Sequence, residues 1–236
     1  EVGEGVPEDK VKAVEYYARG AQAGDETAQC SLGYCYLEGI GAKKDPGRGV
    51  SWLHKAAKQG SLRAMCLLGG CYRDGAGVMK DEKKCVDYLT RAAEGGYAPA
   101  QCNLGLCYEQ GTGVAVDTAK AVEWYTRAAE SGDRAAQCNL GYCLLNGIGA
   151  ARDPAGAVEW FRRAARQGSV RAMNLLADCC RDGVGTQVDL ARAEQLYQEA
   201  VSHGSREAEE SLRKLRIAKA ESRQTKKSLF KRLFGG

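Results

Sequence analysis

The sequence predicts an all-α fold, a right-handed α-solenoid built from 36-residue helix-turn-helix repeats. Three residue series support this prediction, because each recurs every 36 residues without a gap. The series are Ala28, Ala64, Ala100, Ala136, Ala172 and Ala208; Gly24, Gly60, Gly96, Gly132, Gly168 and Gly204; and Asp9, Asp45, Asp81, Asp117, Asp153 and Asp189. A fixed period of this length is typical of proteins in which each unit packs against its neighbours.

The first helix of each repeat, about residues 26–38 in the first complete unit, has amphipathic spacing. Ala28, Leu32 and Tyr36 follow at intervals of four and share one helical face. Gly33 lies within this helix, where glycine costs about 1 kcal/mol relative to alanine. The same glycine recurs as Gly69, Gly105 and Gly141. We infer that a neighbouring backbone packs too closely there for a Cβ.

A turn and a second helix, about residues 46–59, complete the unit. Gly39-x-Gly41 recurs with the same period and predicts glycines of positive φ after the first helix. Asp45 is predicted to cap the second helix, and Pro46 takes the favoured first helical position. The second helices are predicted to bury an aromatic column that ends in a leucine: Tyr16, Trp52, Tyr88, Trp124, Trp160 and Leu196.

These motifs resemble the Sel-one-like repeat, a relative of the tetratricopeptide repeat. The resemblance rests on residues 100–108 (AQCNLGLCY), 111–114 (GTGV), Asp117 and 120–129 (KAVEWYTRAA), and it covers residues 3 to about 212. The sequence departs from the family at Cys30, Cys66, Cys102 and Cys138, where an aromatic residue is usual, and at Asn174, Ala177 and Cys180 in the last unit. The resemblance implies an adaptor or scaffold role.

The register divides the chain into units. They are a partial repeat with a second helix only (1–24), five repeats (25–60, 61–96, 97–132, 133–168 and 169–204), a final helix (205–222) and a basic amphipathic tail (223–236). Residues 28–81 resemble 136–189 more than they resemble 64–117, which suggests duplicated three-repeat blocks. Because the chain starts inside a repeat and lacks an initial Met, we expect further chain upstream.

The eleven cysteines are predicted to be reduced and buried. Cys30 and Cys35, like three other pairs five residues apart, point in different directions on one helix and cannot bridge each other. Equivalent cysteines of successive repeats should lie about 9–10 Å apart, beyond the roughly 7 Å Cα limit for a disulfide. The family's disulfide-bonded secreted members pair the two helices of one repeat, whereas Cys85 is alone in the second helices here. The cysteines are therefore predicted to be small core residues. Their reduced state predicts that the protein lies in a reducing compartment, the cytoplasm.

The sequence offers no set of residues for catalysis, metal binding or a cofactor. His54 and His203 are the two histidines, and neither lies in a nucleophile motif. There is no Cys-x-x-Cys pair, and the vicinal Cys179-Cys180 alone is a weak metal signal. The Gly-x-Gly turns follow a helix and lack the continuation of a dinucleotide-binding loop. We therefore predict a chain that is not an enzyme.

The first helices are expected to carry the binding surface, because in a tetratricopeptide-like superhelix they line the concave face. The predicted contact residues are Tyr34, Arg63, Leu67, Asn103, Leu106, Asn139, Tyr142 and Arg171. Asparagine can hold an extended peptide backbone, while tyrosine and leucine offer apolar contacts. Asn103, Leu106, Asn139 and Tyr142 come from adjacent repeats and are expected to form one patch. Ordinary surface variation is the alternative explanation of these positions.

The C-terminal tail is a second candidate. From Arg213 onward nine Lys or Arg side chains face one acidic residue, while the rest of the chain carries 25 basic and 29 acidic side chains. A basic stripe with apolar residues is predicted for contact with an anionic membrane or an acidic partner: Lys226, Lys227, Leu229, Phe230, Lys231, Arg232, Leu233 and Phe234. A disordered linker is the alternative. The acidic body argues against nucleic acid as a partner.

The sequence therefore favours a non-catalytic scaffold that binds another protein or peptide on its concave face. The competing hypothesis is a regulatory or targeting array of a larger protein whose catalytic domain lies outside this chain. A hydrolase within the repeats would need a constellation of His, Cys and carboxylate groups that the sequence does not provide.

Overall fold

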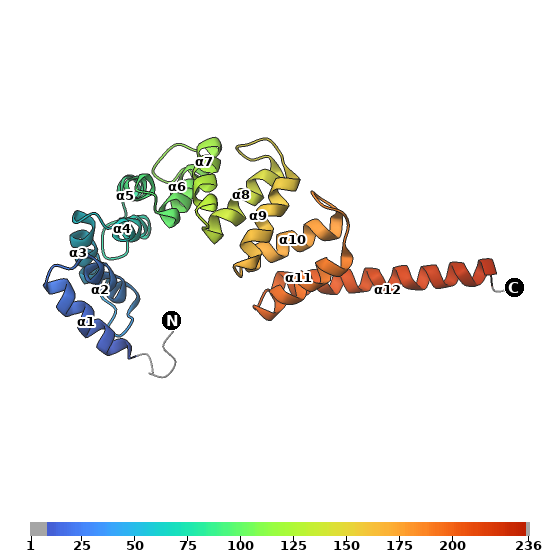
Figure 1. The fold of residues 1–236 in the computed structure, drawn as a ribbon, viewed down its shortest axis with the longest axis horizontal. Helices are drawn as coiled ribbons and strands as arrows, with labels where there is room; N and C mark the ends of the chain where they lie inside the picture. Colours follow the sequence, from blue (N-terminus) through green and yellow to red (C-terminus); the bar gives the residue numbers. More distant parts are fainter. Residues whose placement is uncertain (1–8, 235–236) are drawn as a thin grey trace. The chain divides into compact units, whose positions relative to one another are not determined.

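A computed structural model describes residues 9–234, with side chains through Glu221 and at Gln224 (Figure 1). The described residues form twelve α-helices and no strand, which confirms the predicted α-solenoid of paired helices. Contacts within the chain define two units, Glu1–Asp133 and Arg134–Gly236. The two units are described separately below.

The first unit holds the helices drawn from blue to green in Figure 1. They are α1 (Lys10–Gln22), α2 (Glu26–Glu38), α3 (Pro46–Lys58), α4 (Leu62–Asp74), α5 (Glu82–Glu94), α6 (Ala98–Gln110) and α7 (Thr118–Glu130). Helices α2, α4 and α6 are first helices, and each packs most extensively against the second helix that follows it. Gln29, in α2, is buried, and its side-chain amide donates a hydrogen bond to the Ala21 carbonyl of α1 at 3.2 Å. This bond joins one repeat to the next.

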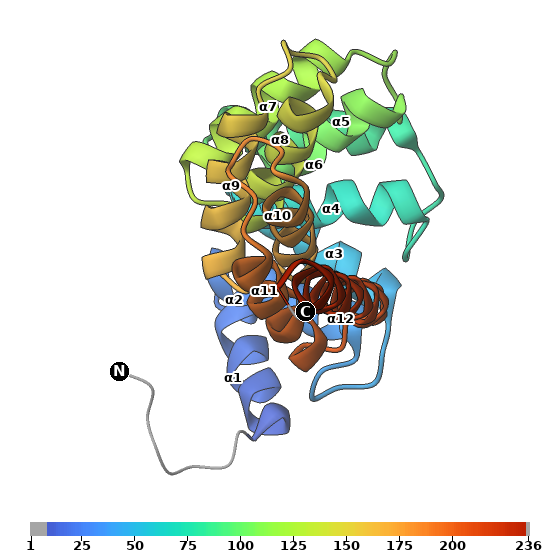
Figure 2. The same ribbon diagram turned by 90° about the vertical axis from the view of Figure 1, so that its right-hand side faces the viewer.

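The second unit begins with α8 (Arg134–Asn146) and ends with a helix of 29 residues. Its other helices are α9 (Pro154–Arg166), α10 (Val170–Asp182), α11 (Leu190–Ser202) and α12 (Arg206–Phe234). The first part of α12 packs against α11, and the remainder continues beyond α11 (Figures 1 and 2). Its backbone is helical as far as Phe234, and the side chains of Ser222, Arg223 and all residues from Thr225 onward lie outside the described residues.

Aspartate caps set the start of each second helix, as predicted. The Asp45 carboxylate accepts a hydrogen bond from the Arg48 amide at 3.0 Å, and Pro46 follows at the first helical position. Equivalent caps occur at Asp9, Asp81, Asp117, Asp153 and Asp189. These caps satisfy amide groups that would otherwise lack partners at the helix start.

The second glycine of four Gly-x-Gly turns joins neighbouring repeats. Gly41 has a φ of +67°, and a Cβ there would lie 2.1 Å from the Lys10 carbonyl oxygen at the start of α1. Gly77, Gly113 and Gly185 meet the starts of α3, α5 and α9 in the same way, at 2.4, 2.2 and 2.1 Å. Each of these turns therefore rests on the first residues of the preceding second helix, where only glycine fits.

The buried column of the second helices lies one residue beyond the predicted one. The fully buried residues are Leu53, Leu89, Tyr125, Phe161 and Tyr197. In the predicted column only Leu196 is buried, while Tyr16 is 68% exposed and Trp52, Tyr88, Trp124 and Trp160 are half-buried. One residue turns a helix by about 100°, so both columns are apolar but only one faces the first helix.

Basic side chains cover the half-buried aromatic rings. The Lys55 ammonium lies 3.7 Å from the centre of the Trp52 ring, and the Arg163 guanidinium lies 4.5 Å from that of Trp160. Such cation–π contacts explain why large rings can remain at the surface of the second helices.

The glycines within the first helices lie close to the neighbouring second helix, as predicted. The nearest atoms belong mainly to a side chain, whereas the prediction named the backbone. A Cβ on Gly141 would lie 2.7 Å from the Phe161 ring and 3.2 Å from the Ala157 carbonyl oxygen. Gly105 stands in the same relation to Tyr125, and Gly33 to Leu53. The glycines therefore make room for the buried column.

All eleven cysteines are buried, as predicted, and carry free thiols. Burial raises the pKa of Cys71 and of Cys179 to about 11, because the surrounding protein solvates a thiolate poorly. Burial also raises the pKa of Cys30, Cys66 and Cys138.

We expect these thiols to react slowly with an aromatic disulfide reagent at pH 8. A pKa raised by about 2 lowers the thiolate fraction at pH 8 on the order of 100-fold, and burial also blocks access. A spectrophotometric titration of the native chain should show few fast thiols, whereas the chain in guanidinium should release eleven equivalents. Fast reaction of most thiols in the native chain would contradict this core assignment.

Candidate functional site

The first-helix face of the second unit contains a groove of about 430 Å³ between α8 and α10. Both helices are first helices of consecutive repeats, so this is the face on which sequence analysis placed partner binding. The groove is lined by Tyr142, Leu145, Asn146, Arg152, Leu175, Asp178, Cys179, Asp182 and Val184. Apolar side chains with a few charged groups are typical of sites that bind peptides or small molecules.

A second groove, of about 550 Å³, lies one repeat further along between the ends of α10 and α11 and the side of α12. Its lining residues are Arg181, Leu190, Ser211, Lys214, Leu215, Ala218 and Lys219. Five of these stand 36 positions after residues of the first groove: Arg181 after Leu145, Ser211 after Leu175, Lys214 after Asp178, Leu215 after Cys179 and Ala218 after Asp182. The two grooves are therefore one feature of the repeat, formed twice.

The second groove is open because α12 does not end where the earlier first helices end. In the preceding repeat Gly185 covers the start of α9. The residue that corresponds to Gly185 one repeat later is Glu221, and it lies within helix α12. The start of α11 therefore lacks a covering turn, and Leu190 is 37% exposed there.

The two grooves carry opposite charge. Asp178 and Asp182 line the first, together with Arg152, whereas the second is lined by Arg181, Lys214 and Lys219. Most of these groups are already ion-paired within the chain: Lys214 contacts Glu210 at 2.7 Å, and Lys219 contacts Glu194 at 2.6 Å. Arg181 contacts Asp178 at 2.8 Å and Asp182 at 2.6 Å, and its hydrogen bond lowers the pKa of Asp182. Asp182 therefore stays ionised at neutral pH, and the first groove keeps its carboxylates.

Three of the residues predicted to bind a partner gather at the first groove. Arg171 donates a hydrogen bond to the side-chain oxygen of Asn139 at 3.0 Å, and its guanidinium lies 5.3 Å from the centre of the Tyr142 ring. Tyr142 itself lines the groove. These three residues, predicted from the sequence, therefore lie at one side of this groove.

The other predicted residues lie on first helices of the first unit. The Arg63 guanidinium lies 5.7 Å from the Tyr34 ring centre. Asn103 is half-buried, and its amide contacts the Cys66 sulfur at 3.5 Å. Leu67 and Leu106 are half-buried on α4 and α6. The predicted patch that joins Asn103 and Leu106 to Asn139 and Tyr142 spans both units and stays a prediction.

Sequence analysis missed most of the groove lining, including Leu145, Arg152, Val184 and Leu190. Arg152 and Val184 lie in the turns, which sequence analysis treated only as connections. The uninterrupted helical composition after Leu215, with no Gly-x-Gly at 219–221, was the signal for the second groove.

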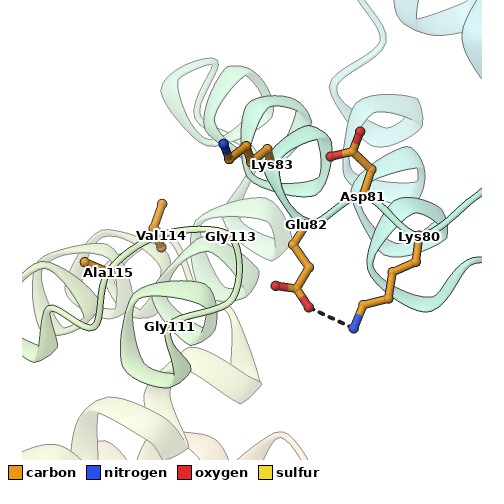
Figure 3. A pocket seen from close by; sticks show the side chains of 8 residues that line it. All are labelled: Lys80, Asp81, Glu82, Lys83, Gly111, Gly113, Val114 and Ala115. Carbon is orange, nitrogen blue, oxygen red and sulfur yellow. Dashed lines mark ion pairs between the residues drawn. The ribbon is translucent and has the colours of Figure 1, made fainter.

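A hollow of about 720 Å³ lies in the first unit between the start of α5 and the turn after α6 (Figure 3). Its charged groups are engaged with their neighbours: Lys80 contacts Glu82 at 2.8 Å, and Asp81 caps α5 through the Lys84 amide. The hollow is the seat of a repeat turn, with Gly113 against Glu82. We therefore do not assign it a binding role.

Two further features concern metals and membranes. Within the described residues, no group of three or more His, Cys, Asp or Glu side chains is arranged to hold a metal ion. None of the described helices is both long and apolar enough to cross a membrane. The predicted membrane-contact side chains, Lys226 to Phe234, lie outside the described part of the chain.

The paired, repeating helices define a helical-repeat protein. The chain belongs to the Sel1 repeat family, whose repeat model matches residues 1–25, 27–61, 62–97, 98–133, 134–169 and 170–205. Proteins of this family are generally protein-interaction scaffolds. No curated protein matches the chain in sequence.

Two solved structures are similar over most of the chain. A protective antigen of uropathogenic Escherichia coli strains, described as having an SLR fold, is 32% identical with a TM-score of 0.78. The match covers 88% of this chain but 44% of that one, so this chain spans less than half of its length. A Sel1 repeat protein from Oxalobacter formigenes is 30% identical with a TM-score of 0.74, and the match covers 88% of this chain and 87% of that one.

Proposed function

We propose that the chain is a non-catalytic scaffold that binds an extended segment of a partner protein along the first-helix face of the second unit. The observation that carries this proposal is the repetition of one groove at a 36-residue interval with opposite charge. A segment that crosses both grooves would place apolar side chains against Leu175 and Leu215. It would present a basic residue to Asp178 and Asp182 and an acidic one to Lys214 and Lys219.

The difference in charge between the two grooves favours one orientation of the bound segment over the reverse. A partner segment laid in the reverse sense would bring its basic residue to the lysines and its acidic residue to the aspartates. Such like-charge contacts disfavour the wrong orientation and wrong partners. Eleven buried free thiols support a reducing compartment, such as the cytoplasm, as the place of action.

Removal of the Tyr142 ring is expected to weaken partner binding at least tenfold, because aromatic anchors carry much of the energy of such contacts. A peptide selected from a random library on the intact chain is labelled, and its binding is measured by fluorescence anisotropy. The variant is Tyr142→Ala. A reversed-sequence peptide tests the predicted direction.

Trp160→Ala is the matched control, because Trp160 is also a half-buried ring under an arginine but lies on the second-helix face. Thermal melts of both variants separate loss of binding from loss of folding. Equal peptide affinity for Tyr142→Ala and the unmodified chain, with Trp160→Ala impaired, would show that the first-helix face is not the binding face.

A further inference from the structure

The second-helix face carries a recurring pair of cation–aromatic contacts. In one register a basic residue near the start of the second helix covers a tyrosine at the end of the first helix: Arg48 on Tyr36, Lys84 on Tyr72 and Lys120 on Tyr108. In the other register a basic residue covers an aromatic ring of its own second helix: Lys55 on Trp52, Arg91 on Tyr88, Arg127 on Trp124 and Arg163 on Trp160.

The last complete repeat keeps the first cation and loses both rings. Arg192 stands in the register of Arg48, Lys84 and Lys120, but the tyrosine position is Cys180. The aromatic position of the second helix is Leu196, and its covering arginine is replaced by Glu199. In the preceding repeat the tyrosine position is Leu144 and the cation position is Gly156, so only the last repeat combines an arginine with a cysteine and a leucine at the ring positions.

A pocket of about 270 Å³ lies at these positions between α9, α10 and α11. Its floor is apolar, because Ala165, Leu176, Cys180 and Leu196 are all buried. Its rim holds three arginines, Arg162, Arg166 and Arg192, and one carboxylate, Glu199. The pocket shares α10 with the peptide grooves, but none of its lining residues lines either groove, so it is a separate site.

Two of these guanidinium groups affect the electrostatics of the pocket floor. Burial raises the pKa of the Cys180 thiol and Asp189 adds to this, while Arg162 and Arg192 oppose it. Glu159 forms an ion pair with Arg162 from outside the pocket lining, and Arg192 donates to the Gln195 side chain at 3.3 Å. Counting Glu199 on the rim, three carboxylates therefore neighbour the three arginines, so the preference for phosphate rests on guanidinium hydrogen bonds rather than on net charge.

We propose that this pocket binds a phosphate monoester, with the phosphate group held by Arg162, Arg166 and Arg192 and a short organic part against the apolar floor. Guanidinium groups match phosphate oxygens with paired hydrogen bonds, and three of them favour a dianion over a monoanion. The volume suits a small phosphorylated molecule or a single phosphorylated side chain.

The test uses the full chain and titration calorimetry with three probes at low ionic strength: O-phospho-L-serine, inorganic phosphate and acetate. O-Phosphoserine is expected to bind, and acetate is expected to bind at least tenfold more weakly. Binding of inorganic phosphate alone as tightly as O-phosphoserine assigns the site to the free anion, whereas tighter O-phosphoserine binding shows that the organic part makes contacts of its own in the pocket. Absence of phosphate binding, or acetate binding of equal strength, overturns the proposal.

Two variants locate the binding site. Arg192→Gln removes one guanidinium, and Cys180→Tyr restores the ring found in the repeats of the first unit and fills the pocket; each should weaken O-phosphoserine binding at least tenfold. Arg213→Gln, an exposed arginine on α12, removes the same charge elsewhere and should change the affinity less than twofold. Circular dichroism checks folding, and the exposed Arg166→Gln replaces any variant that fails to fold. Equal weakening by Arg213→Gln, or no effect of the pocket variants, overturns the proposal.

Discussion

Replacement of Phe161 by alanine is expected to lower the free energy of unfolding by about 3–5 kcal/mol, because it empties a fully buried position. Phe161 is 0% exposed, and its ring fills the space above Gly141. The adjacent Trp160 is as large but half-buried under Arg163. Trp160→Ala should therefore cost about 1–2 kcal/mol, since much of the ring already contacts water.

Urea unfolding followed by circular dichroism measures both variants, and the difference between them is the decisive quantity. Two adjacent aromatic residues on one helix provide an internal control for helix propensity and expression. A larger loss for Trp160→Ala than for Phe161→Ala would place the core column in the register that sequence analysis predicted, and the packing described for α9 would be wrong.

Gly185→Ala is expected to be the most damaging of the glycine substitutions in the second unit. Its φ of +69° costs an alanine about 1–2 kcal/mol. Its Cβ would also lie 2.1 Å from the Pro154 carbonyl oxygen, and the required backbone shift adds about 1–3 kcal/mol. Thermal melts should show a markedly lower midpoint.

Gly204→Ala separates the two contributions. Gly204 has a φ of +85°, but a Cβ there meets no atom within 4 Å, so only the conformational cost applies. Similar melting temperatures for Gly185→Ala and Gly204→Ala would show that the turn does not rest on the start of α9 as described.

The repeat period was sufficient to predict the helices, their caps and their turns. Asp45, Pro46 and Gly39 act through neighbours within a few residues, so their effect can be inferred from local sequence. The same holds for the burial of the ten cysteines other than Cys85, because their spacing places them on inward faces of the first helices.

The candidate site was predictable only in part. Tyr142, Asn139 and Arg171 vary between repeats on an outward face, which sequence spacing reveals. The opposite wall of the groove depends on how far α8 lies from α10 and on where the turn residue Arg152 is placed. No spacing along one helix contains that information.

By itself, the sequence determined the repeat fold and the helix boundaries within the repeats, because these depend on local periodicity and chain geometry. Only the tertiary structure decided which of two adjacent apolar columns is core, and that Gln29 is buried with its amide bonded to the Ala21 carbonyl. It also decided where small residues such as Cys180 leave space. These outcomes depend on how one helix is rotated against its neighbour, and a rotation of about 100° exchanges buried and exposed positions without changing the periodicity.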